Sequence, residues 1–141
     1  MPTSLVRWLI EYDNCRASID DLPQECLFQP VFNGETLLHI FAMWGYADAV
    51  RQLVRRGADV MARIPQGGET PLHVAAAGGK IEICHELVRV GGDQLLNAKT
   101  HEGYTARQYA EIYFLHEKYH SVTGIQDYER LLKFLSGNTG D

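Results

Sequence analysis

Apolar residues recur in the middle of the chain at the spacing of an amphipathic helix. Two runs, which begin at Ala49 and Ile83, carry apolar side chains at positions i, i+1, i+4 and i+5. This spacing places them along one stripe of a helix, so each run is predicted to bury one face. The runs are followed by Gly57 and Gly91, and glycine is common where a helix ends. We therefore expect two amphipathic helices that stop at these glycines.

A shorter helix is predicted in front of each amphipathic helix. The two apolar stretches concerned start after Thr36 and Thr70 and end at Gly45 and at Gly78–Gly79. A threonine hydroxyl can accept a hydrogen bond from an otherwise unpaired N–H group of the first helical turn. Pro71 suits that turn, because its missing N–H has no helical partner there. Each unit is thus expected to run helix, turn, helix, loop.

The two units are copies of one pattern. The run GETLLH that starts at Gly34 returns as GETPLH at Gly68, which is a shift of 34 residues. The same shift superimposes the two amphipathic runs, and it carries the Gly-Ala-Asp at 57–59 onto the Gly-Gly-Asp at 91–93. A unit of this size cannot bury its apolar face alone, so a repeat of this length predicts a stack of units around one continuous core.

This pattern resembles the ankyrin repeat. The run from Gly68 to Gly79, GETPLHVAAAGG, is similar to the family pattern G-x-T-P-L-H-x-A-A-x-x-G, and residues 66–99 match it most closely. Residues 32–65 match with departures, since leucine replaces the proline and phenylalanine replaces the first small alanine. The resemblance implies an all-α solenoid of stacked antiparallel helix pairs. It also implies that His39 and His73 tie one loop to the next through a side-chain hydrogen bond.

We expect a single ankyrin-repeat domain over residues 1–141, with degenerate terminal caps. Residues 1–31 are interpreted as an N-terminal capping helix and a long connection. The helix is centred on Leu5–Ile10, whose sequence resembles residues 49–54, so it is interpreted as a lone second helix. The connection is predicted to hold a short helical turn at Ser18–Glu25.

Two full repeats, residues 32–65 and 66–99, are expected to be followed by a degenerate, extended C-terminal repeat at residues 100–138. The repeat spacing breaks after Ala110, and the additional residues lie around 112–126. They predict a longer first helix and a loop, before a closing helix that ends near Gly137.

The resemblance also implies where a partner would bind. Ankyrin arrays generally bind proteins with the tips of their hairpin loops and with the exposed side of their first helices. The positions carried over are Gln66, Gly67, Glu69, Ala77 and Gly78 in the best repeat, Phe32, Asn33, Glu35, Met43 and Trp44 in the preceding one, and His101, Glu102, Tyr104, Ile112 and Tyr113 in the last.

The chemistry of these positions predicts the character of the partner. Six of them are apolar or aromatic: Phe32, Met43, Trp44, Tyr104, Ile112 and Tyr113. Aromatic anchors often dominate the binding energy of an interface, and an open apolar patch usually marks one. Since Glu35, Glu69 and Glu102 edge this surface, we expect a protein partner that is apolar with basic neighbours. The alternative is packing within the chain, with Trp44 under the long connection and Tyr113 under the segment around 112–126.

Composition and charge exclude several classes of partner. The net charge of the 141 residues is −5, whereas nucleic-acid binding draws on a concentrated positive field. No apolar run approaches the roughly 20 residues that span a bilayer, and the N-terminus lacks the pattern of a secretory signal. The three cysteines are an odd number and form no C-x-x-C pair, which disfavours a disulfide framework or a zinc site. We expect a cytoplasmic or nuclear protein that binds neither nucleic acid nor membrane.

No constellation for catalysis or metal binding stands out. His116 and His120 have the i, i+4 spacing that can chelate zinc on a helix, but no third or fourth ligand accompanies them. Cys84 lies in an apolar stripe, so it is interpreted as a core residue. The arginines at 51, 55 and 56 are interpreted as a solvated face. We therefore predict no enzyme activity, no cofactor, no metal and no small-molecule substrate.

The leading functional hypothesis is a non-catalytic module that binds, and inhibits or scaffolds, a partner protein. Within this class the chain is similar to short inhibitory ankyrin proteins that mask Rel-type (NF-κB) transcription factors, including reduced versions carried by viruses and other pathogens. The acidic loop edge would suit a basic nuclear-localisation segment. The alternative is a blocker or regulatory subunit that plugs the active site of an enzyme. A zinc enzyme built on the histidine pair, or a module of a longer protein, are further hypotheses.

Overall fold

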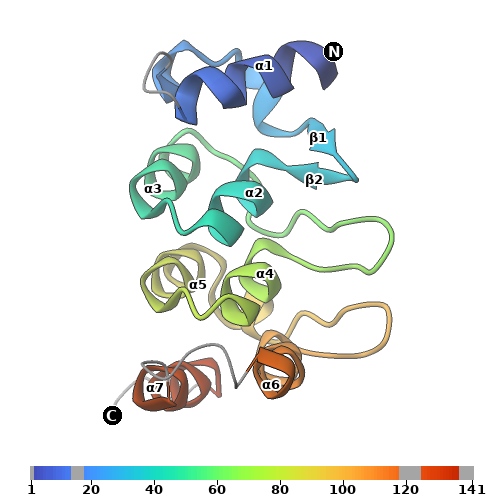
Figure 1. Cartoon of the computed structure of the whole chain (residues 1–141), viewed down its shortest axis with the longest axis vertical. Helices are drawn as coiled ribbons and strands as arrows, with labels where there is room; N and C mark the ends of the chain where they lie inside the picture. The colour runs from blue at the N-terminus through green and yellow to red at the C-terminus, as the bar shows by residue number, and fades with distance from the viewer. Residues whose placement is uncertain (1, 14–17, 118–124, 137–141) are drawn as a thin grey trace.

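The computed structural model describes residues 2–13, 18–117 and 125–136, and within them the helices stack in two columns (Figure 1). Three helix pairs form the stack: α2 (Leu37–Trp44) with α3 (Ala47–Arg55), α4 (Pro71–Ala77) with α5 (Ile81–Leu96), and α6 (Ala106–Glu117) with α7 (Ile125–Leu135). The first helices α2, α4 and α6 lie in one column, and the second helices α3, α5 and α7 lie in the other. The predicted all-α solenoid is confirmed.

The histidine loop ties are present in both repeats, and the predicted hydroxyl cap is present at Thr70, whose Oγ1 accepts from the backbone N–H of His73 at 3.4 Å. The backbone N–H of Thr36 donates to Nδ1 of His39 at 3.3 Å, and the backbone N–H of Thr70 donates to Nδ1 of His73 at 3.2 Å. Because Nδ1 is an acceptor, the proton lies on Nε2 of each ring. His39 Nε2 lies 3.0 Å from the carbonyl oxygen of Glu69, and His73 Nε2 lies 2.9 Å from that of Tyr104. Each histidine therefore ties its own repeat to the loop of the next one.

Burial keeps these two histidines neutral. Both side chains are fully buried, and the loss of hydration lowers the pKa of His39 and of His73 from the ordinary histidine value. A neutral ring can accept at one nitrogen and donate at the other, and both bonds of the tie need this arrangement. Protonation of either ring would remove the acceptor at Nδ1, so the stability of the ties depends on pH.

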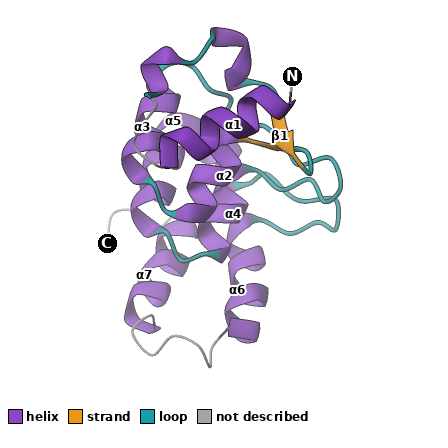
Figure 2. Cartoon of the chain, turned by 45° about the horizontal axis from the view of Figure 1, so that its top comes forward, coloured by secondary structure: helices purple, strands orange, loops and turns teal. Residues whose placement is uncertain are grey.

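The loops between repeats project from the same side of the stack (Figures 1 and 2). The first is a short antiparallel hairpin of β1 (Pro30–Phe32) and β2 (Glu35–Thr36), with Asn33 at a φ of 54° in its turn. Neighbouring loops are held together by Arg63, whose Nη1 donates to the carbonyl oxygens of Gly68 at 3.0 Å and Lys99 at 2.6 Å. The loop surface is therefore joined by bonds from one repeat to the next.

The N-terminal segment covers the first full repeat. The helix α1 (Pro2–Asp13) brings the rings of Trp8 and Tyr12 to within 6.3 Å and 5.1 Å of the fully buried Phe41 ring. Phe41 replaces a small family alanine, and its larger ring is packed by these two aromatic side chains. A helix is present where the N-terminal cap was predicted. Its aromatic side chains contact Phe41 of α2, and Asp13 at its end accepts a hydrogen bond from Tyr46 in the α2–α3 turn.

The connection after α1 contains two short 3₁₀ helices, η1 (Ile19–Asp21) and η2 (Gln24–Leu27), within the span where a helical turn was expected. Arg56 fastens η1 to the end of α3, since its Nη1 donates to the carbonyl oxygen of Ile19 at 2.7 Å. The interpretation of Arg56 as part of a solvated face is therefore wrong. Arg51 pairs with Asp48 and Glu82, whose side chains are largely exposed, so its ion pairs agree with a solvated face.

The second helix of the best repeat runs further than expected. The helix α5 passes through Gly91, and the break in helical backbone falls at Gly92 (φ 60°, ψ −153°), after which one more turn reaches Leu96. A Cβ at position 91 would lie 2.7 Å from the Cβ of Leu95, so a side chain there would clash with this added turn. The added turn is retained because Leu95 and Leu96 are buried in the core.

The C-terminal repeat has the predicted longer first helix. The helix α6 has 12 residues against 7 in α4, and α7 closes the stack and ends at Leu135. Residues 118–124 of the segment that was predicted to hold the insertion lie outside the described residues, and so does His120 of the histidine pair. In the described part of the chain, no helix is both long enough and apolar enough to cross a membrane.

Candidate functional site

The loop tips and the first helices place most of the predicted partner-binding residues on accessible surface. The exposed ones are Asn33, Met43, Trp44, Gln66, Gly78, His101 and Glu102. The half-buried ones are Glu35, Gly67, Glu69, Ala77, Tyr104 and Ile112. The side chains of Phe32 and Tyr113 lie outside the described residues. We call this set of exposed and half-buried positions the loop-and-helix surface.

Met43 and Trp44 form the most apolar part of this surface. They end α2 and are 44% and 39% exposed. The Trp44 ring makes edge contacts with Phe41 and Tyr46, at centroid distances of 6.0 Å and 5.4 Å. These contacts hold one side of the indole while the rest of the residue stays open to solvent. Among the described residues, the ring contacts of Trp44 come from its own repeat and not from the long connection that was considered as its cover.

Two carboxylates of neighbouring repeats lie at the base of the loops. Burial raises the pKa of Glu35, and the nearby negative charge of Glu69 raises it further. Glu69 accepts a hydrogen bond from Tyr109 Oη at 3.2 Å through Oε2, and its Oε1 is buried without a hydrogen-bond partner among the described residues. Glu69 is therefore partly inside the repeat rather than a freely solvated edge charge. Tyr109 was missed by sequence reasoning, although it faces the same side of α6 as Ile112, three residues on.

Two further predicted residues hold the loops together. The backbone N–H of His101 donates to the carbonyl oxygen of Gly67 at 2.9 Å. Nε2 of the His101 ring lies 3.1 Å from the carbonyl oxygen of Pro65. Tyr104 supplies the carbonyl oxygen to which His73 is bound. Both residues have a structural role besides any role in binding, so substituting them would disturb the loops as well as the surface.

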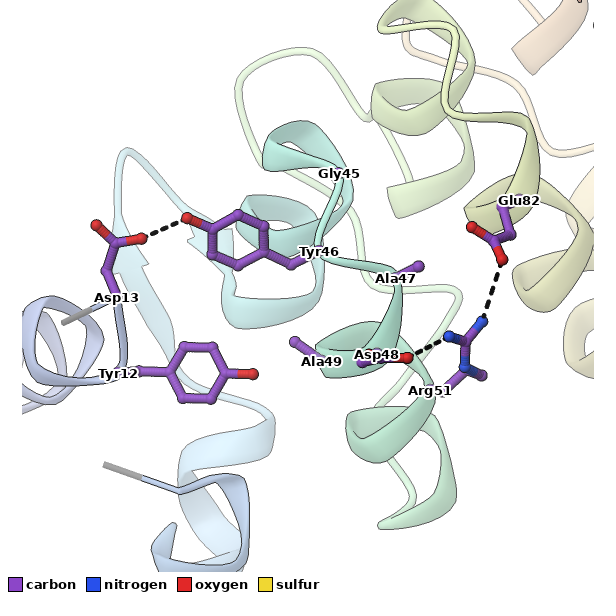
Figure 3. Close-up of a pocket in the computed structure, with 9 residues that line it drawn as sticks. All are labelled: Tyr12, Asp13, Gly45, Tyr46, Ala47, Asp48, Ala49, Arg51 and Glu82. Carbon is purple, nitrogen blue, oxygen red and sulfur yellow. Dashed lines mark hydrogen bonds and ion pairs between the residues drawn. The ribbon is translucent and has the colours of Figure 1, made fainter. Parts of the chain in front are cut away.

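A separate pocket lies at the turn end of the helices (Figure 3), and the sequence did not predict it. It has a volume of about 750 Å³ between the end of α1, the α2–α3 turn and the starts of α3 and α5. Its lining residues are Tyr12, Asp13, Gly45, Tyr46, Ala47, Asp48, Ala49, Arg51 and Glu82. Tyr46 Oη donates to Asp13 Oδ1, and Arg51 pairs with Asp48 and, at 3.8 Å, with Glu82.

Cys84 is not available as a nucleophile. Cys84 is fully buried in α5, and this burial raises the pKa of its thiol to about 12. Only a thiolate is an effective nucleophile or metal ligand. The interpretation of Cys84 as a core residue is thus confirmed by its position. Among the residues that the structure describes, no group of three or more histidine, cysteine or acidic side chains is arranged to hold a metal ion.

Comparison with known families agrees with the stacked helix pairs and the histidine ties. A model described as ankyrin repeats in three copies matches residues 2–100. The chain belongs to the ankyrin-repeat family. Members of this family act through protein–protein contacts, so the chain is a protein-interaction module. A search among curated proteins finds no match to this ankyrin-repeat protein. The matched region starts at the first residue of α1 and ends before α6, so the inclusion of α6 and α7 in the array rests on the structure.

Proposed function

We propose that this ankyrin-repeat protein binds one partner protein through its loop-and-helix surface, in the cytoplasm or the nucleus, and inhibits or scaffolds it. The observation that carries this proposal is the exposure of Met43 and Trp44 side by side at the end of α2. Large apolar residues are costly to leave in water, and a cluster of them on a soluble domain usually marks a contact. Trp is also among the residues that most often anchor an interface.

The setting of Trp44 favours binding over a purely structural role. The contacts with Phe41 and Tyr46 restrict the indole before a partner arrives. A restricted side chain loses less conformational entropy on binding than a mobile one. Met43 beside it has an unbranched side chain that adapts to irregular partner surfaces. Together they provide one rigid and one adaptable apolar contact.

The charges around this apolar contact favour a basic partner segment. Glu35 and Glu69 are half-buried and close enough to raise the pKa of Glu35, while Glu102 is exposed at the next loop. A partner cation near the first two carboxylates would relieve their mutual repulsion. A Rel-type transcription factor, whose basic nuclear-localisation segment would meet these carboxylates, is the partner class that we propose to be masked.

The test is calorimetric binding to a purified Rel-homology dimer that retains its nuclear-localisation segment. We compare Met43→Arg with Val90→Arg, because Val90 is similarly exposed, at 47%, but lies on the second helix α5. A positive charge at position 43 should weaken binding of a basic partner by tenfold or more (about 1.4 kcal/mol), and the same change at position 90 should not. A Rel dimer that fails to bind rejects this partner, and equal affinities of the two variants reject the surface.

A further inference from the structure

The pocket at the turn end of the helices combines aromatic walls with carboxylates. In Figure 3, Tyr12 reaches in from α1 and Tyr46 from the α2–α3 turn, with Asp13 beside them. Its volume of about 750 Å³ falls within the range of roughly 300–1,000 Å³ that is usual for binding pockets. The pocket therefore has the size and the mixed lining of a recognition site.

Its charges fall into two groups. Arg51 lies at the α3 and α5 side, where Asp48 and Glu82 pair with it. Asp13 lies at the α1 side, where the Tyr46 hydroxyl donates to one of its oxygens. Lys80 approaches the rim at Gly45, since a Cβ there would lie 3.4 Å from its Nζ. Among the described residues around the pocket, three carboxylates thus face two cations, and Asp13 is the carboxylate that takes part in neither ion pair of Arg51.

The ligand that suits the α1 side is a flat cation. A guanidinium group can stack on a tyrosine ring through cation–π attraction, and its N–H fork matches the geometry of a carboxylate. A carboxylate accepts more than one hydrogen bond, so Asp13 can keep its bond with Tyr46 while it receives another. A neutral or anionic ligand would leave the charge of this corner uncompensated.

The corner also adjoins the surface proposed to bind the partner. The ring centroids of Tyr46 and Trp44 lie 5.4 Å apart, so one partner segment can cover both. We infer that the corner formed by Tyr12, Asp13 and Tyr46 receives an arginine side chain of the partner protein. This inference rests on the proposed function only in that the arginine belongs to a partner. The pocket itself can be tested without that partner.

The experiment titrates the ¹⁵N-labelled full chain with N-acetyl-arginine amide and, separately, with N-acetyl-citrulline amide, which has the same shape without the charge. The arginine probe should shift the amide signals of Tyr46, Ala47 and Asp48 in a saturable manner, and the citrulline probe should not. Equal shifts with the two probes, or shifts scattered away from the pocket, overturn the inference whatever the outcome with the Rel dimer.

A substitution at the corner separates this site from general attraction to an acidic protein. Asp13→Asn keeps an acceptor oxygen for Tyr46 and removes the charge, so the arginine probe should bind about threefold to fivefold more weakly. Asp93→Asn is the matched control, because Asp93 is exposed at the far end of α5 and does not line the pocket. An equal loss in the two variants shows that net charge alone attracts the probe, and this overturns the inference.

Discussion

Removing the ring of His73 tests the most specific interaction between neighbouring repeats. His73→Leu keeps an apolar side chain in the buried site but deletes the acceptor for the Thr70 N–H and the donor for the Tyr104 carbonyl oxygen. Both groups then lack their side-chain partner in a site where His73 is fully buried. An unsatisfied buried polar group costs about 1–3 kcal/mol, so the two together predict a loss of about 2–6 kcal/mol in the free energy of unfolding. Domains of this kind have only about 5–15 kcal/mol in total.

The same substitution should change how stability depends on pH. Burial lowers the pKa of His73 in the folded state, and the positive charge of Arg63 lowers it further, from an ordinary value of 6.5. When the pH is below that ordinary value but above the lowered folded-state pKa, His73 is protonated in the unfolded chain and neutral in the folded chain. The free energy of unfolding therefore falls as the pH falls through this window, by at most about 1.4 kcal/mol per pH unit for each such histidine. Burial also lowers the pKa of His39. His73→Leu should therefore remove one of the two histidine contributions to the pH dependence of the free energy of unfolding.

The assay is urea unfolding followed by circular dichroism at about pH 7.5 and about pH 5.5, on either side of the ordinary histidine pKa. Wild type should lose more stability on acidification than His73→Leu does. His85→Gln is the control for loss of an imidazole that makes no loop tie. Its ring centroid lies 3.9 Å from that of Phe134, so the change should cost about 1 kcal/mol. A loss below ~0.5 kcal/mol for His73→Leu at the higher pH, or a pH dependence equal to that of wild type, refutes the reasoning.

Three further predictions concern the cap, the core and a turn. Arg56→Met deletes the donor to the Ile19 carbonyl oxygen, which should cost about 1 kcal/mol and speed hydrogen exchange in residues 18–27 selectively; uniform acceleration would contradict it. Cys84, with a thiol pKa of about 12, should resist a disulfide reagent at neutral pH in the native state and react once urea unfolds the chain; rapid native labelling would contradict its burial. Gly45→Ala places a side chain at a φ of 83° and should destabilise by about 1–2 kcal/mol, measured as a lower urea midpoint; an unchanged midpoint would contradict the turn.

The repeated pattern was predictable because it depends on local rules. The shift between Gly34 and Gly68 gave the register, the threonines marked the starts of α2 and α4, and the family resemblance implied the role of His39 and His73. Each of these features depends on residues a few positions apart or on one repeated distance. They survive in the structure for that reason.

The rest depends on contacts between segments that are distant in the chain. Arg56 looked like one of three solvated arginines, yet its partner is the carbonyl oxygen of Ile19, 37 residues away. Glu69 looked like an open edge charge, yet the hydroxyl of Tyr109, 40 residues away, bonds to it. No periodicity encodes such pairs, since each depends on how the terminal segments fold back on the array.

The pocket is another product of long-range packing. Asp13 and Tyr46 are 33 residues apart, and α1 brings them together because Trp8 and Tyr12 pack on Phe41. The sequence did show the phenylalanine as a departure from the family pattern. Its consequence, a cap that creates a new surface at the turn end, appears only once α1 is placed over α2.

Site-specific photo-crosslinking tests the proposed binding surface most directly. A benzoyl-phenylalanine at position 43, which is exposed at the end of α2, is compared with the same residue at position 90 on α5. In the presence of the Rel-homology dimer, position 43 should crosslink to the partner and position 90 should not. A crosslink from position 90 with none from position 43 would contradict the claim that Met43 and Trp44 lie in the interface.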